Sequence, residues 1–495
     1  MAANTKEQGS KAEGSSAFDA YQTSLTTRYC SPAMSKLFSQ RSRHSTWRRL
    51  WFHLAECEKE LGINTITPEA IEQMKAHLVV TDDEFEIARI EEKIRRHHVH
   101  AFGVVAPAAA GIIHLGATSC FVTDNTELIL MRDALDLIAK KLAKVISNLS
   151  SFAVKWKAEP TLAYTHLQAA QLITVGKRAA QWAQDLMLDL HTIEQVRSEL
   201  KFRGAQGTTG TQASFLEIFQ GDSAKCDELN VLLCKRFDFP GCYDVSTQTY
   251  TRKVDLIIAN AVAGLGATAQ KITGDLRHLA TWKEIEEPHE SSQIGSSAMA
   301  YKVNPMRSER VYSLARELMS KPASFANTLS DQWMERTLDD SAIRRIDIPE
   351  MFLLADAILL GLDNISSGLV VYPNRIAFRV QEELPFMITE TIIMRMVAQG
   401  ASRQETHEQI RVISNQAGSV VKNEGKPNDL VSRIQNNEFF KPIWGDIHGM
   451  LKADLYIGRS AEIVDKYCGP GGVVEKALAP YAAYIKGSSS AELSV

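Results

Sequence analysis

The residues from Gly295 to Arg310, GSSAMAYKVNPMRSER, place two serines beside a glycine and then a lysine, an asparagine and two arginines. An acidic lead-in, KEIEEPHESSQI, comes directly before them. So many polar groups pack poorly into a hydrophobic core, and a run of hydrogen-bond donors suits the stabilisation of negative charge. We therefore interpret this stretch as a loop that carries chemistry.

Further polar segments interrupt the apolar parts of the chain. They are TTRYCSP (26–32), IIHLGATSC (112–120), PTLAYTHLQAAQ (160–171), FRGAQGTTGTQAS (202–214) and ERTLDDSAIRR (335–345). Loops at the ends of a rigid scaffold are where proteins commonly display functional groups. We expect these segments to be loops that supply the remaining site residues.

His166 is the first candidate for acid-base chemistry. A lone histidine is more often a surface or core residue than a catalyst, but Thr165 and Gln168 offer a hydroxyl and an amide that could fix its tautomer. The segment also lies after Pro160, between two long helical patterns. From these residues alone, both interpretations stay open.

The segment 335–345 holds three arginines and Ser341. The arginines are Arg336, Arg344 and Arg345. They form either a charged helix face paired with Asp339 and Asp340, or a grip for phosphate or carboxylate oxygens, which guanidinium groups match bidentately. Arg28 beside Tyr29 offers a second place for an anion.

Two other kinds of site are disfavoured. GTTGTQAS lacks the spacing of a P-loop, and no GxGxxG follows a strand pattern, which argues against nucleotide binding of those two kinds. RRHHVH (95–100) holds three histidines, but adjacent residues face different sides of a helix and no carboxylate or cysteine stands at a useful spacing. The sequence therefore predicts no metal site.

Composition narrows the class of protein. A chain of 495 residues with 45% hydrophobic residues predicts two or three globular domains. A formal net charge of -4 gives no bulk reason to bind nucleic acid or an anionic membrane. The seven cysteines are scattered without a CxxC pair, and neither a signal peptide nor a long apolar run is present, so we expect a cytoplasmic protein.

Long helices must position these loops. Apolar residues recur at alternating spacings of three and four between Asp124 and Lys157, a pattern that spans roughly 50 Å at ~1.5 Å per residue. Asp124 with Glu127 suggests an N-cap. Similar patterns run over 172–202, 252–285, 307–329 and 348–369. Five such helices predict an elongated bundle.

The flanks of the bundle have shorter helical patterns, with a C-cap expected at Gly62 and a capping pattern from Thr81 to Glu84. We predict an all-α protein with three helical domains. Its parts are a disordered N-terminal segment (1–20), an N-terminal helical domain (21–118), a central long-helix bundle domain (119–371) and a C-terminal helical domain (372–495).

Taken together, the motifs resemble the aspartase/fumarase superfamily and, within it, the adenylosuccinate lyase family. They are GIIHLGATSC, THxQ, GTTGTQASF, QTYxRK, GSSAMxYKxNPMRSER, ERTLDDSAxRR, GLVVYP and ELPFM, from Tyr21 to about Lys476. So many motifs in order are very specific. The resemblance implies an aspartase/fumarase-like fold and a β-elimination that releases fumarate from two purine nucleotide substrates, adenylosuccinate and the ribotide SAICAR.

The resemblance also implies roles for individual residues. Ser296 would be the base, His166 the acid, Lys302 the stabiliser of the serine alkoxide, and Glu309 would orient His166. The implied substrate-binding residues are Arg28, Tyr29, Arg96, His97, Thr118, Ser119, Thr165, Gln248, Asn304, Arg310, Arg336, Ser341 and Arg345. The loop RRHHVH is about four residues shorter than the family pattern, so the role of His97 could equally fall to His98.

Members of the family are homotetramers whose long helices form a central bundle, with each site drawing on three chains. The heptad pattern favours such association, because the helices of one chain would expose apolar stripes. The resemblance implies no metal or organic cofactor, and no nucleic-acid or membrane partner. Two alternatives stay open: another lyase of the superfamily, such as an argininosuccinate lyase, and a catalytically silent helical scaffold.

Overall fold

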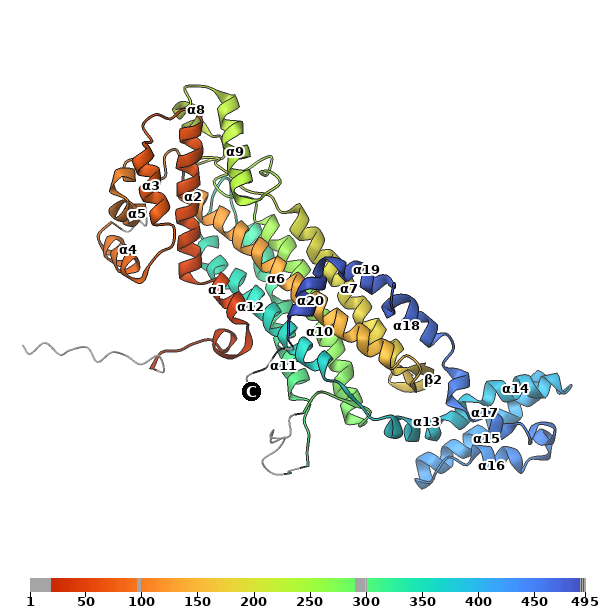
Figure 1. Cartoon of the computed structure of the whole chain (residues 1–495). Coiled ribbons are helices and arrows are strands. Elements are labelled where there is room, and N and C mark those ends of the chain that lie inside the picture. The colour runs from red at the N-terminus through yellow and green to blue at the C-terminus, as the bar shows by residue number, and fades with distance from the viewer. Residues whose placement is uncertain are drawn as a thin grey trace, which may run out of the picture.

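A computed structural model describes residues 19–95, 99–289, 299, 301–489, 491 and 493. This part of the chain is mostly helical, which confirms the predicted all-α class, and its strands form two small antiparallel sheets. The long helices run side by side along one axis, with shorter helices at both ends (Figure 1). Most of the segment predicted to be disordered lies outside the described residues.

Most of the N-terminal helices, from Gln40 onward, gather at one end of the bundle, while the two before them pack along its side (Figure 1). The N-terminal helices are the π-helix η2 (Leu25–Tyr29), α1 (Pro32–Leu37), α2 (Gln40–Glu60), α3 (Pro68–Ala76), α4 (Asp82–Arg95), α5 (Val99–Val105) and η3 (Pro107–Ala109). The predicted capping box is confirmed, because the Glu84 amide donates to Thr81 Oγ1 (3.3 Å) and the Thr81 amide to Glu84 Oε2 (2.9 Å). Gly62 follows α2 with a φ of 101°.

The five predicted long helices are present. They are α6 (Ser119–Lys155), α7 (Val175–Glu199), α10 (Lys253–Thr281), α11 (Met306–Ser330) and α12 (Asp340–Ser367), with the shorter α8 (Ala213–Ile218) and α9 (Ser223–Phe237) between them. The apolar residues that predicted α6 are all buried, from Leu128 to Phe152. Periodicity therefore identified the face of α6 that packs in the core.

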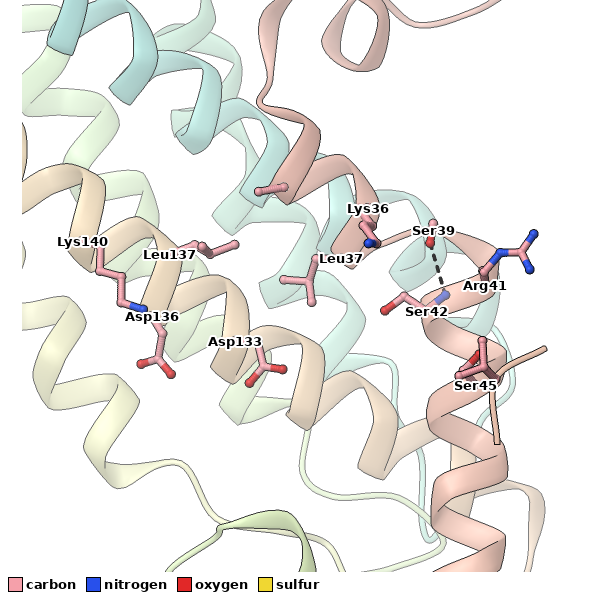
Figure 2. A pocket seen from close by; sticks show the side chains of 12 residues that line it. Lys36, Leu37, Ser39, Arg41, Ser42, Ser45, Asp133, Asp136, Leu137 and Lys140 are labelled. Carbon is pink, nitrogen blue, oxygen red and sulfur yellow. Dashed lines mark hydrogen bonds between the residues drawn. The ribbon is translucent and has the colours of Figure 1, made fainter. Parts of the chain in front are cut away.

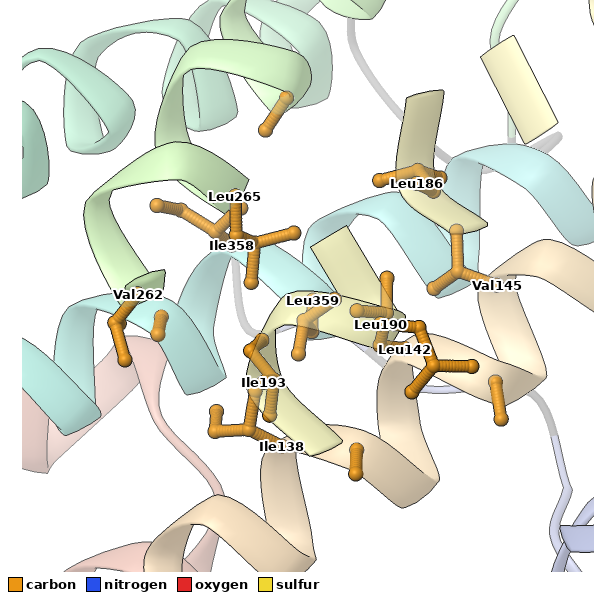
Figure 3. Close-up of a cluster of buried hydrophobic side chains, with 14 of the residues drawn as sticks. Ile138, Leu142, Val145, Leu186, Leu190, Ile193, Val262, Leu265, Ile358 and Leu359 are labelled. Atoms are coloured by element: carbon orange, nitrogen blue, oxygen red, sulfur yellow. The ribbon is translucent and has the colours of Figure 1, made fainter. Parts of the chain in front are cut away.

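Side chains from four of these helices meet in the middle of the bundle (Figure 3). The cluster includes Ile138, Leu142 and Val145 of α6, Leu186, Leu190 and Ile193 of α7, Val262 and Leu265 of α10, and Ile358 and Leu359 of α12. At one end, α7 approaches α6 so closely that a Cβ on Gly176 would lie 2.2 Å from the Ala153 carbonyl oxygen. This tight core holds the two ends of the bundle in a fixed relation.

Two helix starts differ from the prediction. Asp124 is not an N-cap, because α6 begins at Ser119 and Asp124 is a buried partner of Arg252. Similarly, α12 begins at Asp340 rather than at Ile348, because the first two turns carry polar residues that pair with other helices instead of following an apolar period. In both helices, polar side chains continue the helix beyond the apolar pattern.

The segment 160–171, expected as a loop, is a β-hairpin. Strands β1 (Pro160–Thr165) and β2 (Gln168–Thr174) pair antiparallel, with Thr165 opposite Gln168. Consequently α7 begins at Val175 rather than at Leu172. A second small sheet joins β3 (Ile285–Glu286) to β4 (Val370–Val371).

The C-terminal part first forms a lobe beyond the hairpin and then runs back along the bundle (Figure 1). Its elements are α13 (Pro373–Met387), α14 (Thr389–Ala398), α15 (Arg403–Glu424), α16 (Leu430–Gln435), η4 (Glu438–Ile443), α17 (Ile447–Met450), η5 (Ala453–Tyr456), α18 (Ser460–Cys468), α19 (Val473–Leu478), η6 (Ala479–Tyr481) and α20 (Ala482–Gly487). Of these, α18 packs on α6 and α7, and α20 packs on α6.

Candidate active site

The predicted site residues fall into groups separated by the length of the bundle. Thr118 immediately precedes α6, and the hairpin that carries His166 follows it. The 37 residues of α6 span about 55 Å at ~1.5 Å per residue. Within one chain, Thr118 and His166 therefore cannot contact the same small molecule.

The first group lies at the N-terminal end of α6, which we call the Thr118 end. It contains Thr118, Ser119, Gln248, Arg336, Ser341 and Arg345. The link from α6 is Cys120, whose Sγ lies 3.9 Å from Gln248 Oε1. The Gln248 backbone amide in turn donates to the Glu335 carbonyl oxygen (3.3 Å), beside Arg336. Loops that are distant in the sequence thus converge at one end of the bundle.

A buried charge network underlies the Thr118 end. Arg252 contacts Asp124 (2.9 Å) and Asp340 (2.7 Å), and both of these carboxylates are buried. Burial by itself would raise the pKa of Asp124, but the positive charges of Arg252 and Arg344 outweigh it and hold that pKa below its usual range. The paired charges fix the start of α10 and α12 against α6.

The three arginines of 335–345 have different environments. Arg336 pairs with Asp340 (2.9 Å), as one of the two interpretations expected. Arg344 is buried and instead contacts Asp255 of α10 (2.8 Å). Arg345 is exposed and has no ion pair within the described part of the chain. Of the three, Arg345 is therefore the guanidinium that is available for an anion.

A second group brings together residues of the N-terminal segment and of α11. The Arg310 guanidinium lies over the Tyr29 ring, 5.0 Å from its centroid. Lys302 is exposed and Asn304 half-buried, just before α11. The segment with Arg28 and Tyr29 is held to α12, because the Ser31 amide donates to Asp356 Oδ2 (2.6 Å).

A cavity of about 1000 Å³ adjoins this group. Arg28 and Tyr29 line it together with Lys141 and Lys144 of α6. Its wall also includes part of the C-terminal segment, where the Ala491 amide donates to Asp363 Oδ2 (2.9 Å). Sequence reasoning did not single out the two lysines, because in the sequence they look like the ordinary polar face of α6.

A second cavity, of about 810 Å³, lies between α1, the start of α2 and α6 (Figure 2). Leu37 and Leu137 line it with charged residues such as Lys36, Asp133 and Asp136. None of the predicted site residues borders it. We therefore do not assign this cavity to the candidate active site.

The third group is the tip of the β1–β2 hairpin, which we call the hairpin end. His166 and Leu167 form the two-residue turn with φ values of 55° and 57°. Positive φ at both positions matches the twist of a tight hairpin and turns the imidazole outward. The tautomer role expected of Gln168 is not seen, because its amide Nε2 donates to the Leu167 carbonyl oxygen (3.2 Å).

Glu309, predicted to orient His166, lies in the first turn of α11. Its carboxylate lies 3.8 Å from the Arg277 guanidinium of α10. Three further predicted site residues, Ser296, Arg96 and His97, lie outside the described residues, as does most of the histidine cluster. Their predicted roles therefore stay predictions.

Glu287 is a residue that sequence reasoning missed. Its carboxylate accepts from the amides of Arg307 (2.9 Å) and Ser308 (2.8 Å) and from the Ser308 hydroxyl (2.9 Å). These bonds satisfy free amides at the start of α11, directly after the serine- and lysine-bearing stretch GSSAMAYKVNP. The signal for it was the acidic lead-in KEIEEPHE before a helix.

Other classes of site find no support in the described residues. Within 19–95, 99–289 and 301–489, no three His, Cys, Asp or Glu side chains come together as potential metal ligands. Likewise, no helix of that part is both long and apolar enough to cross a membrane.

Comparison with solved structures identifies the fold. A 3-carboxy-cis,cis-muconate lactonizing enzyme from Pseudomonas putida superimposes with a TM-score of 0.76 at 20% identity, covering 93% of this chain and 99% of that one. A fumarate lyase from Mesorhizobium sp. BNC1 gives 0.75 at 22% identity, with 91% and 99% covered. The chain has the fold of the aspartase/fumarase superfamily.

Sequence comparison then gives the particular family. A lyase family model matches residues 27–320, and a model for the adenylosuccinate lyase C-terminus matches 385–467. The adenylosuccinate lyases of Saccharomyces cerevisiae and Schizosaccharomyces pombe are 53% and 52% identical over 94% of this chain and 98% of their own lengths. That of Schistosoma mansoni is 46% identical over 91% and 94%. The chain belongs to the adenylosuccinate lyase family.

Proposed function

We propose that the protein cleaves adenylosuccinate to AMP and fumarate, and SAICAR to AICAR and fumarate, in purine nucleotide biosynthesis. The observation that carries the proposal is the near-full-length similarity to adenylosuccinate lyases. Ser296, His166 and Lys302 lie in the segments of this chain that resemble the family's motifs. Both reactions break a C–N bond by β-elimination. A cytoplasmic location agrees with seven cysteines that form no disulfide in the structure.

The difficult step is removal of a carbon-bound proton next to a carboxylate, which places a second negative charge on that carboxylate. Donors aimed at this charge stabilise the transition state by roughly 3 to 4 kcal/mol each. In this proposal Ser296 takes the proton, and Lys302 with Asn304 stabilises its alkoxide. His166 protonates the departing nitrogen, a role that contributes about 10² to 10⁴ in rate.

The nucleotide end of the substrate needs cationic and aromatic contacts. We assign it to Arg28, Tyr29 and Arg310, which the Tyr29–Arg310 contact supports, together with Arg345 and its neighbours Arg336 and Ser341. Arg96 and His97 complete this end in the proposal. Thr118, Ser119, Thr165 and Gln248 hold the succinyl side.

The separation of these groups supports assembly of each site from several copies of the chain. Because α6 keeps Thr118 about 55 Å from the hairpin, a complete set of site residues needs more than one subunit. We propose a homotetramer with sites shared between three subunits. The exposed imidazole of His166 is then directed at a neighbouring subunit rather than at its own.

The test is release of fumarate by the purified protein from adenylosuccinate, SAICAR and argininosuccinate, each in a separate assay. We expect release from the first two. The Ser296→Ala variant is the control, and it should assemble normally without turnover. Release from argininosuccinate alone, or no release from any substrate, would overturn the proposal.

A mixing experiment tests the shared site. Ser296→Ala and His166→Gln are each expected to be nearly inactive, but hybrids made by dissociating and reassociating the two variants together should regain part of the activity. Some sites in a hybrid then combine an intact serine with an intact histidine from different chains. Hybrids no more active than the parents would show that each site lies within one chain.

A further inference from the structure

Arg203 is a fully buried arginine, 0% exposed, whose guanidinium is held by backbone groups. It donates to the carbonyl oxygens of Gly204 (3.1 Å), Gly207 (3.0 Å) and Thr247 (3.4 Å). No ion pair of Arg203 occurs in the part of the chain that the structure describes. Burying a guanidinium against carbonyls is costly even though the charge of Asp124 acts favourably on it, and an apolar residue would fill a core position at a lower cost in free energy.

The three carbonyls belong to two loops that touch backbone to backbone. Gly204, Gly207 and Gly210 have φ values of 73°, 79° and 81°, and a Cβ on Gly210 would lie only 1.9 Å from the Ser246 carbonyl oxygen. The left-handed turns point carbonyl oxygens inward, toward the place that the Arg203 guanidinium occupies. The Arg203 side chain thus joins loops 203–212 and 246–248 through hydrogen bonds.

Loop 203–212 is also hydrogen-bonded to α6, through Asn125. Asn125 Oδ1 accepts from the amides of Arg203 (3.1 Å) and Gly204 (3.0 Å), and its Nδ2 donates to the Gly204 carbonyl oxygen (3.2 Å). Asn125 lies six residues after Ser119, one of the predicted substrate contacts at the Thr118 end. Loop 203–212 is therefore bonded directly to the helix that begins at the candidate site, and Arg203 connects loop 246–248 to it.

Thr247, the third carbonyl partner, directly precedes Gln248. We propose that Arg203 is a positioning residue that sets the orientation of the Gln248 side chain. This inference rests on the proposed function, in which Gln248 contacts the succinyl side of the substrate. By holding the Thr247 carbonyl, the guanidinium fixes the peptide from which the Gln248 side chain projects. It acts through Gln248 and does not touch the substrate.

Geometry rather than charge is what the position requires. A guanidinium donates in several fixed directions within a plane, and three carbonyls use them, whereas an ammonium is a compact charge on a flexible stem. Arg203→Lys therefore keeps the positive charge but loses the planar set of hydrogen-bond donors. In the full-length enzyme it should lower kcat/KM for adenylosuccinate about tenfold or more.

A double-mutant cycle separates positioning from general structural damage. In a Gln248→Ala background, Arg203→Lys should cause no further loss beyond about twofold, because the group that it positions is already gone. The matched control is Arg132→Lys, whose guanidinium also donates to backbone carbonyls, those of Phe237 and Asp238. It should leave kcat/KM within about twofold of the parent enzyme. An equal fold-loss from Arg203→Lys in both backgrounds would overturn the proposal.

A second measurement does not depend on activity, so it distinguishes failure of this inference from failure of the proposed function. Backbone hydrogen exchange in the segments 204–212 and 246–249 should become faster in Arg203→Lys and stay unchanged in Arg132→Lys. Unchanged exchange in both variants would overturn the positioning role, whatever the substrate is. If Arg203→Lys does not fold, Arg203→Gln is measured in the same way.

Discussion

The two ends of the long bundle differ in how their polar side chains are held. At the Thr118 end, the charged side chains Asp124, Arg252, Asp340 and Arg344 are buried and paired with one another. At the hairpin end, His166 stands exposed at a two-residue turn and forms no hydrogen bond within the described residues. One end is pre-organised inside the subunit, and the other presents its functional group outward.

This difference separates stability from activity. Buried pairs are costly to break because a single remaining charge is left without a partner, whereas an exposed side chain contributes little to folding. Substitutions at the Thr118 end should therefore be seen first in unfolding experiments. Substitutions at the hairpin tip should be seen first in turnover.

The largest expected effect comes from Arg252→Met. Removing the guanidinium leaves buried Asp340 with Arg336 alone and buried Asp124 with the more distant Arg344 (3.9 Å), which should lower the free energy of unfolding by about 3 to 5 kcal/mol. Urea unfolding at one fixed protein concentration measures it. Arg411→Met, which removes an exposed pair with Glu408, is the control and should change little. Equal unfolding curves for the two variants would contradict the expected difference between buried and exposed ion pairs.

A pH-dependent test uses Glu58 of α2, a buried carboxyl that lacks the charged partners of Asp124. Burial raises the pKa of Glu58 to about 9, from 4.5, and neither of its oxygens has a hydrogen-bond partner. Its folded form thus keeps a proton that the unfolded chain loses above pH 4.5, so this group's contribution to stability falls as pH rises from there toward 9. At pH 7 the loss is about 3 kcal/mol, taking ~1.4 kcal/mol per pH unit.

Glu58→Gln removes this titration. The variant should therefore be more stable than the parent by about 3 kcal/mol at pH 7, with the gain shrinking toward pH 5. Unfolding curves at the two pH values measure it, and the exposed Glu69→Gln in α3 serves as the control. A stability difference that does not vary with pH would show that Glu58 is not neutral in the folded protein.

At the hairpin end, His166→Gln should lower turnover by at least about 10²-fold with the melting temperature unchanged. The reason is that the imidazole is exposed at the tip of its own chain's hairpin, so its removal takes away the proposed acid without disturbing the fold. The rate of fumarate release and a thermal melt measure the two quantities. A smaller loss would make His166 a positioning group rather than the acid.

The smallest effect concerns the support of the hairpin. Tyr164 stacks on Trp282 with ring centroids 4.4 Å apart, so Tyr164→Leu should cost about 1 kcal/mol of stability. Turnover should fall only a few-fold, because a looser hairpin still carries His166. Leu167→Asn at the tip is the control, since asparagine readily adopts a positive φ. Loss of turnover as large as in His166→Gln would mean that the hairpin must be rigid.

Much of the scaffold could be predicted from the sequence because its signals are periodic and local. The apolar repeat of α6 identified its buried face, and the pattern from Thr81 to Glu84 identified a cap whose two hydrogen bonds lie within four residues. The hairpin could not be recognised in this way. Its turn has no glycine or asparagine, and a positive φ at Leu167 is not what this residue type favours.

The buried charge network could not be predicted from local sequence patterns either. Asp124 looked like a cap because Glu127 follows it at the right spacing, yet its partner Arg252 is 128 residues away. Long-range pairs of this kind leave no period or motif in a single sequence. Glu287 is an intermediate case, since an acidic run before a helix marks the place but not which carboxylate binds the amides.

The length of α6 limits where the chain can accept insertions and deletions. A single residue inserted into its middle would move one end by ~1.5 Å and rotate it by about 100° relative to the other, because an α-helix has ~3.6 residues per turn. In the proposed tetramer, the hairpin and the Thr118 end would then no longer face their neighbouring subunits in register. Insertions and deletions should therefore be absent from α6 and occur instead in the connections between helices.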